Sequence, residues 1–64
     1  MIITTQLAEE DTTLYLNTSH IFTIKPLDDE ISEIAFIGSN VTIKVKEEAR
    51  NLKRRINDLY QNGQ

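Results

Sequence analysis

Apolar and polar positions alternate in five short segments, and the alternation then changes to a helical period for the rest of the chain. The five segments are rich in β-branched and aromatic side chains and are separated by polar or acidic clusters, which is typical of β-strands. The predicted strands cover residues 1–7, 12–16, 20–25, 31–37 and 41–46.

Three connections between these strands have residues that favour turns. Asn17 opens a turn cluster with Thr18 and Ser19, because an Asn side chain can accept a hydrogen bond from the backbone just after it. Pro26 is expected to end the third strand, since it has no N–H for pairing. Residues 38–40 (Gly-Ser-Asn) predict a tight hairpin between the last two strands, because Gly and Asn accept positive φ.

From about residue 47 the apolar positions follow a period of 3.6, which predicts an amphipathic helix over residues 47–61. Glu47 and Glu48 lie at its start, where carboxylates interact favourably with the helix dipole. Gly63 or Asn62 is expected to end it. The apolar stripe consists of Ala49, Leu52, Ile56, Leu59 and Tyr60.

The predicted fold class is therefore α+β, with a small antiparallel β-sheet of four to five strands followed by one C-terminal amphipathic helix. A chain of 64 residues forms a single domain, β-rich over 1–46. Such a small core gives marginal stability unless a disulfide, a metal or a partner subunit adds to it. There is no cysteine, and one histidine, His20, cannot build a zinc site. Homo-oligomerisation, with a dimer favoured, is the remaining way to add stability.

The third and fourth predicted strands place apolar side chains on both faces, and one helix can cover only one face of a sheet. We expect a second copy of the chain to cover the other face, although part of this run could instead lie at a strand end or under a loop. The candidate oligomer interface comprises Phe22, Ile24, Ile34 and Phe36.

Charge is distributed unevenly along the chain. Residues 1–33 have seven acidic residues and one lysine, whereas residues 34–64 have three acidic and six basic residues, within a net charge of −3. At 100° per residue, four of the bases form a ridge along one side of the predicted helix, and this basic ridge is the candidate partner-binding surface. It consists of Lys46, Arg50, Lys53 and Arg54.

The basic ridge has three interpretations: a solvated helix face, a docking surface for an acidic protein, or a nucleic-acid contact. The nucleic-acid interpretation is disfavoured because the domain is acidic overall and no aromatic residue is interleaved for base stacking. Glu47 and Asp58 also lie close enough on the helix to pair with its bases.

No motif predicts catalysis. The acidic clusters at residues 9–11 and 28–30 lack the alternating ligand spacing of a calcium loop and are interpreted as solubilising turns. Ser19 and His20 have no evident orienting partner. If His20 lies in a subunit interface, its titration could modulate assembly. The two glycines lie too far apart for a phosphate loop, so we expect no enzyme, no metal and no cofactor.

A set of positions spread over most of the chain matches the pattern of a known family. These positions are Met1-Ile2, Thr5, Leu7, Tyr15-Leu16-Asn17, Ile21, Ile24, Ile43 and Val45-Lys46-Glu47. In these residues the chain resembles the FlbD-like small flagellar and swarming-motility proteins, and that resemblance implies a non-enzymatic protein. The chain departs from the family at Gln6, where a basic residue is usual, and at Ser39-Asn40, where an Asn-Gly turn is usual. Its first turn is also longer and acidic.

In architecture the chain is also similar to the carbon-storage regulators, RNA-binding dimers that open with a similar strand and end in a helix. Their RNA-binding arginines would fall at Gln6 and near Lys46-Glu47, and their Gly-Asp and Ala-Pro signatures are missing here. The similarity is thus one of architecture, and RNA binding is not implied.

These observations together predict a cytoplasmic, non-enzymatic interaction module that self-associates and binds a protein partner. One alternative is a small dimeric nucleic-acid-binding regulator that uses the basic helix. Another is a small acidic inhibitor of a host protein, encoded by a virus or mobile element. We expect no signal peptide and no membrane span, because no long apolar run is present.

Overall fold

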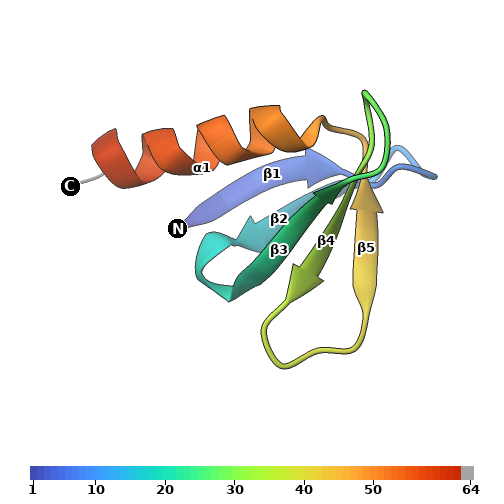
Figure 1. Ribbon diagram of the computed structural model, residues 1–64, viewed down its shortest axis with the longest axis horizontal. Helices are drawn as coiled ribbons and strands as arrows, with labels where there is room; N and C mark the ends of the chain where they lie inside the picture. Colours follow the sequence, from blue (N-terminus) through green and yellow to red (C-terminus); the bar gives the residue numbers. More distant parts are fainter. Residues whose placement is uncertain (63–64) are drawn as a thin grey trace.

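The computed structural model describes residues 1–62 and has five antiparallel strands followed by one α-helix (Figure 1). A short 3₁₀ helix, η1 (Thr18–His20), joins the second and third strands. The α+β class, the five strands and the C-terminal helix are confirmed, and every strand begins and ends within one residue of its predicted bounds. The elements are β1 (Ile2–Gln6), β2 (Thr13–Asn17), β3 (Ile21–Pro26), β4 (Ser32–Phe36), β5 (Thr42–Val45) and α1 (Ala49–Asn62).

The strands form two sheets rather than the single predicted sheet. One contains β1 and β2, and the other has the order β3-β4-β5. From Gln6 onwards the chain pairs with the end of β5 and the residue after it: Lys46 N donates to Gln6 O at 2.8 Å and Ala8 N to Lys44 O at 2.9 Å. Figure 1 shows the ends of β1 and β5 meeting at this junction. These few hydrogen bonds join the two sheets at one corner only. Each sheet therefore keeps free strand edges of its own.

Local turn chemistry follows the sequence closely. The Asn17 side chain caps η1, with Oδ1 accepting a hydrogen bond from Ser19 N at 3.0 Å. Pro26 is the last residue of β3. Within residues 1–62, Gly38 alone has positive φ, at 77°, so Asn40 does not use its tolerance for that conformation. The β4–β5 hairpin is confirmed, with a connection that spans residues 37–41.

A bulge in β3 changes the face of the sheet on which its apolar side chains lie. Ile21 pairs with Phe36 and Ile24 pairs with Ile34, and the register shifts between Ile21 and Thr23. Phe36 and Ile34 lie two apart on β4 and share a face, so the extra residue brings Ile21 and Ile24 onto that same face. Strict alternation, which the two-faced interpretation assumed, would have placed them on opposite faces.

The core lies between the two sheets and α1. Its buried apolar residues come from α1 and from every strand except β3, and Ile56 and Leu59 pack against them, which confirms the apolar stripe of the helix at Leu52, Ile56 and Leu59. Tyr60, also predicted in this stripe, is 44% exposed. The helix begins at Ala49, two residues later than predicted. The predicted helix end at Gly63 lies outside the described residues. The buried apolar residues of the core are Ile3, Leu16, Ile34, Val45 and Leu52.

Candidate binding grooves

Glu47 fixes the start of α1 to β1. Its side chain is only 13% exposed and accepts two hydrogen bonds from Arg55 Nη1, at 2.6 Å and 2.7 Å. Thr5 Oγ1 donates to the same carboxylate at 3.0 Å, and Asn51 Nδ2 donates at 2.6 Å. Arg55 Nη2 also donates to Thr4 O at 2.8 Å, so one carboxylate and one guanidinium join two turns of helix to a strand.

A second contact holds the same segment from the opposite sheet. Ser32, at the start of β4, is fully buried and donates its hydroxyl to the backbone oxygen of Glu47 at 2.6 Å. The segment before α1 is therefore fixed by both sheets. As a result, the first turns of the helix hold a defined position beside β3.

The first turns of α1 and the free edge of β3 enclose a groove of about 420 Å³, which we call the β3–α1 groove. Four consecutive β3 residues line one wall. The partly buried Ile21 and Ile24 and the exposed Phe22 and Thr23 all contribute, so this wall follows the edge of the strand rather than one of its faces. This edge pairs with no other strand in the described chain, because β3 is terminal in its sheet. The lining residues are Ile21, Phe22, Thr23, Ile24, Ala49, Arg50 and Lys53.

The structure separates the four residues of the predicted basic ridge. Arg50 and Lys53 are exposed and line the β3–α1 groove, whereas Arg54 is exposed on the helix outside it. Lys46 precedes the helix, and its Nζ lies 4.0 Å from Asp11 Oδ1. Arg50, Lys53 and Arg54 make no side-chain hydrogen bond or ion pair with any residue in 1–62. Two unpaired cations therefore face the groove.

The predicted oligomer-interface residues are also separated. Ile34 is fully buried in the core and presents no surface to a partner. Ile24 and Phe36 are partly buried against the core, because the β3 bulge and the β4 register direct them inwards. Phe22 alone is exposed, at 71%. It lines the same groove as Arg50 and Lys53, so one member of the predicted interface and two of the predicted partner surface are neighbours.

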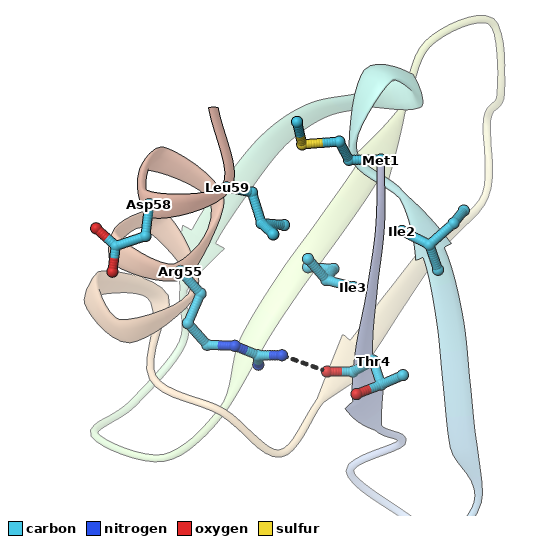
Figure 2. Close-up of a pocket in the computed structure, with 7 residues that line it drawn as sticks. All are labelled: Met1, Ile2, Ile3, Thr4, Arg55, Asp58 and Leu59. Atoms are coloured by element: carbon cyan, nitrogen blue, oxygen red, sulfur yellow. Dashed lines mark hydrogen bonds between the residues drawn. The ribbon is translucent and has the colours of Figure 1, made fainter. Parts of the chain in front are cut away.

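A larger groove of about 730 Å³, the β1–α1 groove, lies on the other side of the helix (Figure 2). Figure 2 shows Arg55 reaching from α1 to Thr4, with Ile3 and Leu59 above it in this view, between the helix and β1. The cation that lines this groove, Arg55, already pairs with Glu47 and donates to Thr4 O, and Asp58 also lines the groove. Its lining residues are Met1, Ile2, Ile3, Thr4, Arg55, Asp58 and Leu59.

The other side chains considered for catalysis or metal binding, in the acidic clusters and at His20, do not come together in one site. Asp28 Oδ1 accepts hydrogen bonds from Glu30 N at 2.8 Å and Ile31 N at 2.9 Å, so its carboxylate shapes a turn as expected. Within residues 1–62, no group of three His, Asp or Glu side chains is placed to hold a metal ion. His20 is exposed at the end of η1, and its imidazole pairs with no described residue.

Sequence reasoning missed the role of Glu47. The expected dipole interaction applies to the first helical turn, but the observed first turn has no acidic residue. A signal was present in the spacing of Glu47, Asn51 and Arg55, which lie four residues apart and therefore on one side of a helix. The edge groove depends on the β3 bulge, for which the sequence gives no comparable signal.

Comparison with protein-family models, curated proteins and solved structures found no match to this chain. Over residues 1–62 the structure has no helix with the length and apolar character needed to cross a bilayer.

Proposed function

We propose that this chain is a small non-catalytic interaction module that binds a protein segment in the β3–α1 groove. The observation that supports this proposal is the convergence of three features in one place: a free strand edge, the exposed Phe22, and the unpaired cations Arg50 and Lys53.

These features match the chemistry of protein recognition. Aromatic side chains and arginine are enriched where binding energy concentrates in protein interfaces. Unpaired cations beside an apolar strip contribute specificity and the rate of encounter with an acidic partner. A strand edge adds backbone donors and acceptors that recognise any extended chain.

Self-association is part of the proposal, with a dimer favoured. Phe22 is the exposed member of the predicted interface and lies on a free strand edge, which readily pairs with another chain. Because the same edge lines the β3–α1 groove, the dimer and the complex with a partner compete for one surface. We also propose a cytoplasmic setting, since a chain without cysteine needs no oxidising compartment to fold.

One observation favours a second candidate function, nucleic-acid binding. The structure places an aromatic side chain, Phe22, in the groove that Arg50 and Lys53 line, and cations beside an aromatic surface are typical of single-strand binding. Against this, Asp28, Asp29 and Glu48 line the adjoining hollow next to Arg50 and would repel a continuous polyanion.

The test is photo-cross-linking in the native host, with a photoreactive phenylalanine analogue in place of Phe22. We expect a discrete protein adduct, whose mass distinguishes a second copy from a different partner. The matched control replaces Tyr15, which is 75% exposed on β2 and does not line the groove. Absence of any protein adduct at position 22, or the same adduct from both positions, would contradict the proposal.

A further inference from the structure

We infer that the β3–α1 groove takes an extended acidic segment of a partner protein, which adds to β3 as a further strand and places its carboxylates against Arg50 and Lys53. This inference rests on the proposed function and adds the chemical class and conformation of the bound segment.

The conformation follows from the shape of the groove. One wall is formed by residues 21–24 of β3, the terminal strand of its sheet, and the opposite wall is the first turns of α1. An extended peptide can pair its own backbone with such an edge, whereas a helix would leave the edge groups without partners. Pro26 ends β3 and has no N–H, so the site accepts only a short strand.

The charge of the segment follows from the cations. Arg50 and Lys53 lie one helical turn apart, both exposed and both without an acidic partner in the described chain. Lys25 adds a third exposed cation on β3 itself. An approaching carboxylate could form ion pairs with Arg50 and Lys53, which form none with residues 1–62.

The length of the acidic stretch follows from the neighbouring hollow. Asp28, Asp29 and Glu48 surround the far side of Arg50. One or two carboxylates can reach Arg50 and Lys53 without meeting these acids, but a long polyanion such as nucleic acid would be repelled by them. Phe22, the second residue of β3, then contacts the apolar residues that alternate with the carboxylates.

The test uses the whole chain and a fluorescent peptide of about eight alternating glutamate and valine residues, long enough to span the six-residue β3. We expect saturable binding that weakens with salt, and no binding of the corresponding lysine–valine peptide. The double substitution Arg50→Glu, Lys53→Glu should weaken binding by about tenfold or more, because it reverses two contacting charges. Arg54→Glu, an exposed cation on the same helix but outside the groove, should leave binding within about twofold.

Strand pairing is tested with two further acidic peptides, N-methylated at every valine or at every glutamate amide. One of them must lose binding by about tenfold or more, since alternate amides face the edge of β3. Equal binding of both would overturn strand addition. Tighter binding of single-stranded oligothymidylate than of the acidic peptide, abolished by the double substitution, would assign the groove to nucleic acid instead.

Failure of this inference is distinguishable from failure of the proposed function. A protein adduct at position 22 together with no peptide binding up to millimolar concentration would retain the groove as a protein site and overturn its acidic, extended occupant. An adduct of twice the chain mass alone, with no peptide binding, would assign the groove to a second copy.

Discussion

The guanidinium of Arg55 holds the carboxylate of Glu47 with both oxygens within 2.7 Å of one nitrogen, while its other nitrogen donates to Thr4 O at 2.8 Å. Arg55 is 37% exposed and Glu47 only 13% exposed, so the pair spans the boundary between solvent and the helix–strand contact. An ion pair this exposed contributes little to the stability of the fold by charge alone. We therefore attribute its stabilising effect to the hydrogen bonds that it organises.

Replacement of Glu47 with alanine is therefore expected to destabilise the fold by about 1–2 kcal/mol, because Thr5, Asn51 and Arg55 all lose an acceptor. Urea unfolding followed by circular dichroism measures the change. Glu48→Ala is the matched control, since the side chain of Glu48 makes no described hydrogen bond. Equal unfolding midpoints for the two variants would contradict this account of Glu47.

Gly38 tests backbone conformation without any effect of packing. A Cβ at this position would meet no heavy atom within 4 Å, but the residue has φ of 77°. Gly38→Ala should thus cost about 1 kcal/mol from the left-handed conformation alone. Gly38→Asn should recover a large part of that cost, because Asn tolerates this region better. Equal thermal midpoints for the alanine variant and the native chain would show that this glycine is not needed.

Leu52 attaches α1 to the core and is fully buried. Leu52→Ala should cost about 2–5 kcal/mol, which is comparable with the whole stability of a domain this small. We expect the variant to be largely unfolded by circular dichroism at 25 °C. Leu27→Ala is the control, since Leu27 is 42% exposed and lies outside the core. A folded Leu52→Ala variant with a native-like midpoint would mean that the helix contributes little to the core.

Self-association is tested by sedimentation equilibrium at tens of micromolar protein. We expect a dimer, and we expect Phe22→Asp to give a monomer, because a charge would replace the exposed ring on the β3 edge. Tyr15→Asp, at a similarly exposed ring on β2, should remain a dimer. A clean monomer for the unmodified chain would remove self-association and leave the groove available to a partner alone.

Local signals predicted most of the fold. Gly38 and Pro26 act through their own backbone preference and Asn17 through a side-chain hydrogen bond to the backbone just after it. The helical stripe follows from burial of one face, so sequence alone was sufficient for these. The division into two sheets was not predictable in this way. It depends on which strands pair over long range, and no short pattern reveals either that choice or the contact of Gln6 and Ala8 with residues 44–46 that links the two sheets.

The candidate site was predicted only in its parts. Arg50, Lys53 and Phe22 were each identified, but as members of two separate surfaces. Their convergence depends on the β3 bulge, which shifts the strand register, and on the helix starting at Ala49 rather than at residue 47. Both are consequences of tertiary packing, in which Ser32 and Thr5 hold Glu47 outside the helix.

The location of the binding surface can be measured directly from backbone amide NMR shifts of the labelled protein during titration with the glutamate–valine peptide. We predict the largest changes at residues 21–24 and at Ala49, Arg50 and Lys53, with protection of β3 edge amides from exchange and little change in β2. Largest changes around Ile2, Thr4 and Arg55 would place binding in the β1–α1 groove and contradict the central claim.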